Sequence, residues 1–327
     1  MSESDGIRQG IYKNAFVRRI ARLLDAMPHP LVACEIAPHY VAAAQWKRGT
    51  YGLGDFAIAE LPPGAVKPSP VESNMADAAV VRQAVEQVLQ QVGVKNQSIA
   101  LLIPDSVIRV FVLHFDVFPR SPSEAVPMLR WRLKKSVPFE AEETLISYMR
   151  QAPREEGVDI VTALARLRIV REYESLLESS NVHPGVVMSS TLAALPLLSD
   201  GRATMLARIS GSMLTTVIAR EGVLCGYRST DLPAELERLD PRALLDEIYP
   251  LAAYYQDAWS EGIQGVRLSG FGARLEDFRP ALEKELRCPV TALMESARSE
   301  GRIGSDAGRL VEHELDSLLG WSLNRGA

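Results

Sequence analysis

The sequence predicts a two-lobed α/β fold assembled from two related halves. Each half begins with three short strands separated by tight turns and continues with a helix and a further strand. The same β-β-β-α-β order, found twice in one chain, predicts a duplication with similar lobes on either side of a cleft. The length of 327 residues and the 47% of apolar residues suffice for two lobes with buried cores.

The composition excludes several classes of function. A net charge of −5 gives the chain no overall attraction to nucleic acid, so we expect no nucleic-acid partner. The three cysteines are far apart in the sequence and have no His nearby at metal-ligand spacing: Cys34, Cys225 and Cys288. We therefore expect no metal site, and we expect the cysteines to behave as small apolar residues in a reducing compartment. The sequence has no signal-peptide pattern and no run of about 18 apolar residues, so we expect a soluble cytoplasmic protein.

The first segment, residues 1–30, is an appendage that ends at Pro28-His29-Pro30. Between residues 14 and 27 apolar side chains recur on one face of a helix, opposite Arg18, Arg19 and Arg22. A basic amphipathic helix of this kind docks on the protein's own surface, on a partner helix or on anionic lipid headgroups. The sequence leaves these alternatives open.

The first lobe is expected over residues 31–106, where alternating apolar residues are separated by turn signals and then give way to a helical pattern. The predicted elements are strands Leu31–Ile36, Tyr40–Trp46, one ending near Leu61, and Ser98–Pro104, with a helix Ala76–Val92.

A different unit is expected over residues 107–183. Ser121 and Glu124 have the spacing of a capping box, in which two side chains satisfy backbone N–H groups at a helix start. The predicted elements are a strand Val107–Phe115, a helix from Ser121 to about Lys135, strands near Leu145 and Ile160, and a helix Val170–Ser180.

The first helix of this unit has a strongly basic end. Cations in a last turn complement the helix dipole, which is a purely structural explanation. They suit contact with a partner protein equally well, and the sequence leaves both interpretations open. The candidate partner-binding residues are Arg130, Arg132, Lys134, Lys135, Pro138 and Phe139.

The second lobe is expected over residues 184–327, with a C-terminal helix that returns to close the fold. Pro250 is expected to interrupt the longest helix, because proline lacks the backbone N–H. The predicted elements are strand Gly185–Met188, helix Thr191–Leu198, strands Ala203–Ile209, Met213–Arg220 and Val223–Ser229, helix Arg242–Trp259, strand Gly265–Leu268, helix Arg274–Leu286, strand Val290–Leu293 and a closing helix over residues 306–323.

Seven short motifs follow one another in a fixed order along the chain. They are Glu35-Ile36-Ala37-Pro38-His39-Tyr40-Val41, Leu61-Pro62-Pro63-Gly64-Ala65-Val66, Ile103-Pro104-Asp105-Ser106-Val107-Ile108, Leu133-Lys134-Lys135-Ser136-Val137-Pro138-Phe139, Ile209-Ser210-Gly211-Ser212, Leu268-Ser269-Gly270-Phe271-Gly272-Ala273 and Gly320-Trp321-Ser322-Leu323. In this order they resemble the motifs of the PilM family of type IV pilus assembly proteins. The resemblance covers about residues 31–325 and implies an actin-like, ribonuclease H-like duplicated fold, with subdomain 1A at 31–106, an FtsA-like subdomain 1C at 107–183 and subdomains 2A and 2B at 184–327.

The resemblance also implies a nucleotide cleft, but both of its phosphate hairpins depart from the family pattern. Where the family has Gly-Ile-Asp-Ile-Gly, the chain has Ala33-Cys34-Glu35-Ile36-Ala37, and Pro38 removes a backbone donor at the turn. In the second hairpin Arg208 stands where the family has Asp, and a guanidinium cannot bind magnesium, although it would hold an anion. The candidate cofactor-binding residues are Glu35, His39, Ser210, Gly211, Ser212, Gly270 and Gly272.

We therefore expect no catalytic residue, no metal and no required cofactor, with ATP binding left possible by the resemblance. The resemblance implies a scaffold peripheral to the inner membrane that binds the cytoplasmic tail of a PilN-like protein, between 1A and 1C, and contacts other pilus platform or motor components. An extended peptide would add to a strand edge near Val107–Phe115 and Arg130–Phe139. The alternatives are an ATP-binding or ATP-hydrolysing actin-like protein and a membrane-surface module, FtsA-like or similar to the type II secretion L protein.

Overall fold

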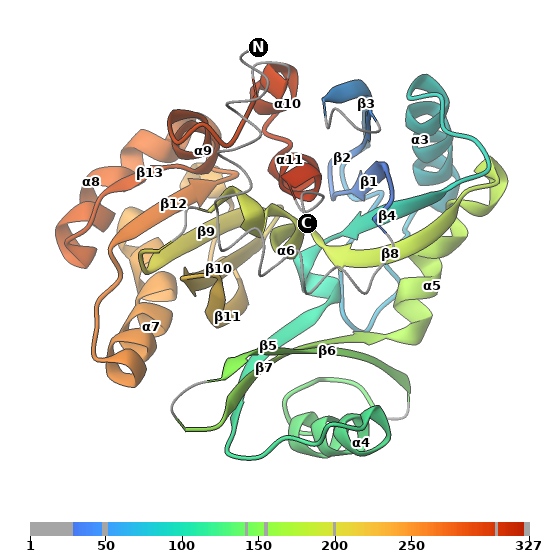
Figure 1. The fold of residues 1–327 in the computed structure, drawn as a ribbon. Coiled ribbons are helices and arrows are strands. Elements are labelled where there is room, and N and C mark those ends of the chain that lie inside the picture. The colour runs from blue at the N-terminus through green and yellow to red at the C-terminus, as the bar shows by residue number, and fades with distance from the viewer. Residues whose placement is uncertain are drawn as a thin grey trace, which may run out of the picture.

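The computed structural model describes residues 29–47, 52–140, 143–153, 156–198, 201–304 and 307–323. The basic helix predicted between residues 14 and 27 lies outside this part of the chain. Within it, no helix combines the length and the apolar character needed to cross a bilayer. Figure 1 shows two lobes side by side, with a smaller unit below them.

The first lobe is built on a five-stranded mixed sheet. It contains β1 (Val32–Ile36), β2 (Tyr40–Trp46), β3 (Leu53–Glu60), β4 (Ser98–Ile103) and β8 (His183–Ser189), in the order β3-β2-β1-β4-β8. Strand β1 is entirely buried and β4 nearly so, because the central strands of such a sheet are covered on both faces. The helix α3 (Ala78–Gln91) packs against β2 and β3.

The second lobe repeats this sheet. It contains β9 (Thr204–Ser210), β10 (Met213–Arg220), β11 (Val223–Asp231), β12 (Gly265–Ser269) and β13 (Val290–Ala292), in the order β11-β10-β9-β12-β13. The parallel and antiparallel pairings match those of the first sheet strand for strand. The predicted duplication is therefore confirmed.

Two helices cover one side of the second sheet. The long α7 (Pro241–Trp259) packs against β10 and β11, and α8 (Leu275–Leu286) packs against α7 and β13. The predicted interruption at Pro250 is wrong, since α7 continues through it. Pro250 lies on the exposed side of the helix, where the loss of one backbone hydrogen bond costs less than it would in the core.

The small unit is a three-stranded antiparallel sheet covered by one helix. It contains β5 (Arg109–Phe115), β6 (Thr144–Pro153), β7 (Val158–Arg166) and α4 (Pro122–Leu133), with the strands in the order β5-β7-β6. The predicted capping box at Ser121 is wrong, because the side chain of this N-cap residue makes no hydrogen bond to the helix backbone. Its hydroxyl lies 2.5 Å from that of Ser123 instead.

The second sheet begins later than the boundary at residue 184 that the sequence indicates. Strand β8 pairs with β4, and α6 (Ser190–Ala194) follows it, so the chain returns to the first lobe after the small unit. Only from β9 onward does it build the second sheet. The shorter elements are α5 (Leu167–Ser175), α9 (Leu293–Ser299) and the 3-10 turns η1 (Asp105–Val107), η3 (Glu178–Ser180), η4 (Leu195–Leu197), η5 (Leu236–Arg238) and η6 (Gly272–Arg274).

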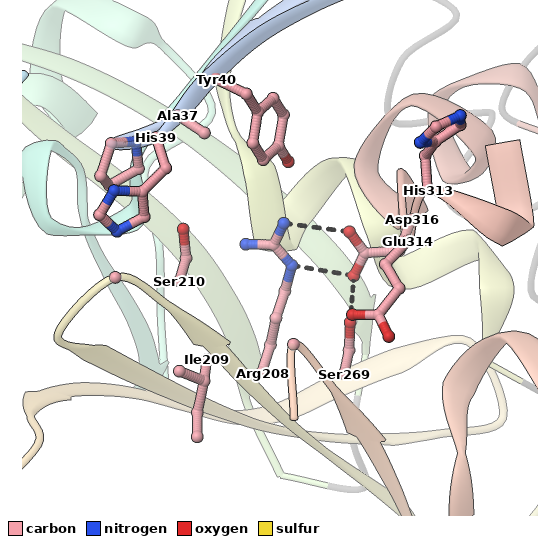
Figure 2. A pocket seen from close by; sticks show the side chains of 13 residues that line it. Ala37, His39, Tyr40, Arg208, Ile209, Ser210, Ser269, His313, Glu314 and Asp316 are labelled. Carbon is pink, nitrogen blue, oxygen red and sulfur yellow. Dashed lines mark hydrogen bonds and ion pairs between the residues drawn. The ribbon is translucent and has the colours of Figure 1, made fainter. Parts of the chain in front are cut away.

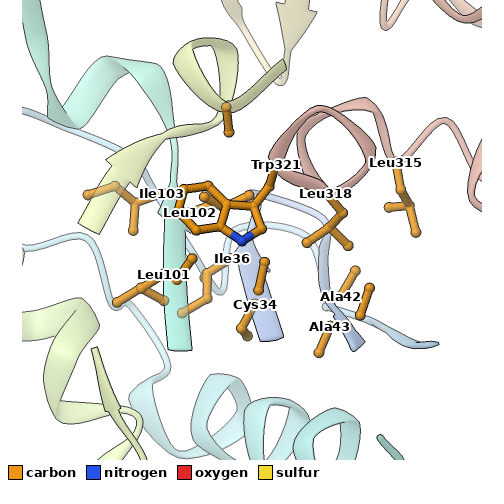
Figure 3. Packing of buried hydrophobic residues seen from close by; sticks show 14 of the residues in the cluster. Cys34, Ile36, Ala42, Ala43, Leu101, Leu102, Ile103, Leu315, Leu318 and Trp321 are labelled. Atoms are coloured by element: carbon orange, nitrogen blue, oxygen red, sulfur yellow. The ribbon is translucent and has the colours of Figure 1, made fainter. Parts of the chain in front are cut away.

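The C-terminal segment forms two helices, so the single helix predicted over residues 306–323 is wrong. After α10 (Gly308–Glu312), Glu314 adopts a left-handed φ of 53°, and α11 (Asp316–Leu323) begins two residues later. Helix α11 packs against β1 and α6. Its Trp321 is fully buried among apolar residues of the first sheet, as Figure 3 shows. The end of the described chain thus belongs to the first lobe.

Candidate functional site

A buried arginine joins the two lobes at the base of the cleft between them. Arg208 lies on β9 of the second sheet, and its side chain is only 5% exposed. Its Nε donates to Asp316 Oδ2 at 2.9 Å and its Nη2 to Asp316 Oδ1 at 3.0 Å (Figure 2). This paired geometry gives the strongest and most directional form of ion pair available to protein side chains.

Two further carboxylates face the same guanidinium. Nη1 of Arg208 lies 3.5 Å from Oδ2 of Asp105, and Nη2 lies 3.5 Å from Oε1 of Glu35. Glu35 is the penultimate residue of β1, Asp105 begins η1, and Asp316 begins α11, all elements that pack in the first lobe. A cation from the second lobe is therefore surrounded by three carboxylates from the first.

The carboxylate oxygens of Asp105 and Asp316 also accept hydrogen bonds from neutral donors. Asp105 accepts from the backbone N–H and the hydroxyl of Thr191, at 3.0 and 2.6 Å, and from the Tyr227 hydroxyl at 3.2 Å. Asp316 accepts from the Ser269 hydroxyl at 2.6 Å and from the backbone N–H of Ser317 at 2.8 Å. Buried carboxylates remain charged at acceptable cost only when their oxygens accept hydrogen bonds in this way.

Glu35 has a different environment from the two aspartates. Its Oε2 accepts from the Tyr40 hydroxyl at 3.0 Å and from the Ser317 hydroxyl. Burial raises the pKa of Glu35, and Arg208 offsets only part of this increase. For Arg208, burial lowers the pKa, but Asp316 and then the other carboxylates outweigh it and leave the pKa well above the ordinary value. The guanidinium is thus always charged, and Glu35 holds a proton more tightly than an exposed glutamate does.

A cavity of about 200 Å³ lies above this cluster, between the lobes (Figure 2). Four of the candidate cofactor-binding residues line it: His39, Ser210, Gly211 and Gly270. Glu35 is buried behind two lining residues, Tyr40 and Arg208, while Ser212 and Gly272 are not part of the lining. The volume is below the roughly 300 to 1,000 Å³ typical of ligand and cofactor pockets.

The turns of the two hairpins both line this cavity and approach each other there. A Cβ placed on Gly211, in the β9–β10 turn, would lie 3.1 Å from Cγ of Pro38 in the β1–β2 turn. These two turns therefore leave no room between them for a phosphate group.

The glycine of the third loop has a structural explanation. Gly270 has a φ of 76°, and a Cβ there would lie 2.0 Å from the carbonyl oxygen of Ile209. Glycine is required by the close approach of β9, whether or not a base or a sugar binds nearby.

The residues of the cleft do not fit a magnesium-bound nucleotide. A guanidinium occupies the space among the carboxylates where a metal ion would need to lie, and it repels a second cation. Nε and Nη2 of Arg208 are directed at Asp316, which leaves them unable to hold a phosphate. In the part of the chain that the structure describes, no group of three His, Cys, Asp or Glu side chains has the arrangement of a metal site.

A second and larger space, of about 540 Å³, separates the small unit from the second lobe. We call it the inter-unit groove. Of the candidate partner-binding residues, Lys135 and Pro138 line it, whereas Arg130, Arg132, Lys134 and Phe139 do not. Its lining residues are Arg109, Val110, Phe111, Lys135, Ser136, Val137, Pro138, Tyr227, Arg228 and Ser229.

The sequence did not identify Asp105 or Asp316 as site residues. Asp105 follows a buried strand and a proline, which was a usable signal for a functional turn. Asp316 has the sequence appearance of an ordinary acidic residue within a helix, and nothing local to it indicates a partner 108 positions away. Only the fold brings these carboxylates to Arg208.

No protein family and no curated protein matches the sequence. Among solved structures, a chain of the PilM-PilN type IV pilus biogenesis complex matches with a TM-score of 0.67 and 18% identity, over 91% of this chain and 99% of that one. A Bacteroides thetaiotaomicron protein with an actin-like ATPase fold and unknown function matches with a TM-score of 0.49 and 10% identity, over 82% and 95% of the two chains. The cytoplasmic domain of EpsL, an inner membrane component of the type II secretion system of Vibrio cholerae, matches with a TM-score of 0.45 and 10% identity, over 84% of this chain and 95% of that one.

The first of these similarities extends over nearly the whole of both chains, and the two sheets repeat one strand order. The fold expected from the sequence resemblance is thereby confirmed. The chain has a PilM-like, actin-like fold.

Proposed function

We propose that this chain is a cytoplasmic scaffold of a type IV pilus assembly machinery, which binds the N-terminal cytoplasmic tail of a PilN-like inner-membrane protein and does not hydrolyse ATP. The observation that supports this most strongly is the full-length similarity in fold to a chain of the PilM-PilN complex. Contacts with other platform or motor components, at the inner face of the membrane, are part of the same proposal.

The inter-unit groove is our candidate site for the tail. Strand β5 is at one edge of its sheet, β11 is at one edge of another, and the two lie alongside each other. Edge strands offer unpaired backbone groups to an extended peptide, and adjacent apolar side chains select its residues. Val110, Phe111 and Val137 supply apolar lining, and the chain around them is hydroxyl-rich and basic.

The proposed lack of hydrolysis follows from the charge cluster at Arg208. Catalysis of phosphoryl transfer depends almost entirely on positioning and on metal-assisted charge stabilisation. Here the carboxylates Asp105 and Asp316 are already hydrogen-bonded to an internal cation and to neutral donors. They are not available to position magnesium, so we infer that ATP turnover is absent.

A binding assay with the full chain tests whether it binds the proposed tail. The ligand is a labelled peptide with the cytoplasmic tail sequence of the membrane protein encoded beside it, and the readout is fluorescence anisotropy. We expect saturable binding by the wild type and at least about tenfold weaker binding by Val137→Glu, because the substitution removes apolar lining that the tail would contact and puts a longer, strongly hydrated side chain in its place.

Val117→Glu is the matched control. Val117 is 82% exposed and lies outside the groove, so the same substitution there leaves affinity unchanged. Failure of the wild type to bind, or equal binding by both variants, would contradict the proposal, provided that thermal unfolding shows both variants folded.

A further inference from the structure

The helix α4 exposes a tryptophan to solvent. Trp131 is 79% exposed, whereas Trp46 and Trp321 are buried and Trp259 is half-buried and stacked on a tyrosine. Tryptophan combines a large apolar ring with a polar N–H, and it is enriched at protein interfaces and at the boundary between membrane and water. The position of Trp131 therefore calls for an explanation outside the core.

The surroundings of Trp131 are apolar toward the start of α4 and cationic toward its end. Helical spacing places Pro127 and Met128 one turn before it and Lys134 one turn after it, on the face opposite Leu129, which packs in the small core. Pro127 and Lys134 are exposed, and Met128 is half-buried.

The cations near Trp131 have no partners among the described residues. Neither Arg132 nor Lys134 takes part in an ion pair there, and both are exposed. Glu124, two turns before Trp131, is the acidic residue of this face. The helix dipole accounts for a preference for cations in the last turn, but it does not account for an exposed indole between them.

We propose that this outer face of α4, formed by Pro127, Trp131, Arg132 and Lys134, docks on the anionic headgroups of a phospholipid bilayer. Indole rings sit at the boundary between headgroups and acyl chains, and Arg and Lys side chains extend from there to lipid phosphates. None of these four residues lines either of the two pockets described above, and a face outside such hollows suits a lipid surface better than a peptide ligand.

The location of α4 agrees with this contact. The helix lies on the outer side of the small unit, away from both lobes (Figure 1). The next residue after Lys134 is Lys135, which lines the inter-unit groove. A bilayer on the outer face of α4 therefore lies close to the groove in which we place the tail of a membrane protein. The lipid contact does not depend on that tail. Failure of one proposal in its experiment therefore leaves the other standing.

The tryptophan itself is the probe. The full chain is mixed with vesicles of phosphatidylglycerol and phosphatidylethanolamine, without any partner protein, and Trp emission is recorded with brominated lipids as quenchers. We expect a blue shift and quenching in the wild type, both lost in Trp131→Phe, because the other described tryptophans are buried or half-buried. Vesicles of phosphatidylcholine alone are expected to give no shift.

Charge-reversal variants distinguish lipid binding by α4 from lipid binding by the basic segment at residues 14–27. In vesicle sedimentation, Arg132→Glu/Lys134→Glu is expected to lower the partition coefficient at least about tenfold, since each cation near an anionic membrane contributes severalfold. The double variant Lys67→Glu/Lys95→Glu, which changes two exposed lysines of the first lobe, is expected to retain binding to within about twofold.

Three results would overturn the proposal. One is binding that survives reversal in α4 and is lost on reversal of Arg18, Arg19 and Arg22. The second is a Trp131 emission shift that follows protein concentration without lipid, which would indicate a second copy of the chain on this face. The third is no emission shift with anionic vesicles.

Discussion

Arg208 and Asp316 form two parallel hydrogen bonds, of 2.9 and 3.0 Å, between the second sheet and a helix packed on the first lobe. Together with Glu35 and Asp105, Asp316 completes an acidic environment on three sides of one guanidinium. The lobes are thus connected by a charge that belongs to the chain itself. This ion pair therefore holds the two lobes together across the cleft.

Removing the guanidinium is expected to destabilise the protein severely. Arg208→Ala leaves three buried carboxylates without their cation, and breaking a buried ion pair in this way costs about 3 to 5 kcal/mol. Urea denaturation followed by circular dichroism measures the change in unfolding free energy.

The matched control is Arg220→Ala, on the strand next to that of Arg208. Arg220 pairs with Glu261 at 2.8 Å, but its side chain is 32% exposed, so the expected loss is below about 1 kcal/mol. Equal effects of the two substitutions would contradict the role given to Arg208.

The stability of the wild type is expected to fall relative to Glu35→Gln as the pH rises. Because burial raises the pKa of Glu35 above 4.5, the folded protein holds this proton more tightly than the unfolded chain does. The stability that this proton contributes to the folded state is complete below pH 4.5. It is lost as the pH rises through the higher pKa of Glu35 in the folded state. The glutamine variant carries a neutral amide throughout and shows no such loss.

Denaturation at several pH values between 4 and 8 measures this difference. The expected slope is at most about 1.4 kcal/mol per pH unit, the value for one proton. The prediction is contradicted if the difference in unfolding free energy between wild type and Glu35→Gln does not vary with pH. It is also contradicted if the wild type becomes the more stable of the two as the pH rises. Either result would show that Glu35 is ionised over this range.

Gly270→Ala is expected to destabilise the chain far more than Gly272→Ala. Both glycines have positive φ, but a Cβ on Gly270 would overlap the Ile209 carbonyl, whereas nothing lies within 4 Å of one on Gly272. We expect about 3 kcal/mol for Gly270, from overlap and backbone strain together, and about 1 kcal/mol for Gly272, from strain alone. Equal losses in chemical denaturation would mean that β9 does not approach the third loop this closely.

The sequence predicts the sheets well because their signals are local. The buried run of β1 and the hairpins that follow it are visible within a few residues, and the same pattern recurs from β9. The break at Glu314 could not be predicted, since a left-handed glutamate has no sequence signature of the kind that glycine provides.

The candidate site could be predicted only in part. The sequence shows that Arg208 replaces an expected Asp and therefore disfavours magnesium, but it does not show that the guanidinium is neutralised internally. That depends on Asp105 and Asp316, which are 103 and 108 positions away from Arg208. Long-range placement of this kind is a property of the fold, and no local pattern contains it.

The most direct test of our proposal that the cleft does not hydrolyse ATP is phosphate release from Mg-ATP by the purified chain, measured with the proposed partner's tail peptide present and absent. We expect no release above the buffer rate in either case, because Arg208 already occupies the centre of the acidic cluster. Turnover that Glu35→Gln abolishes, in a variant shown to be folded, would contradict the proposal.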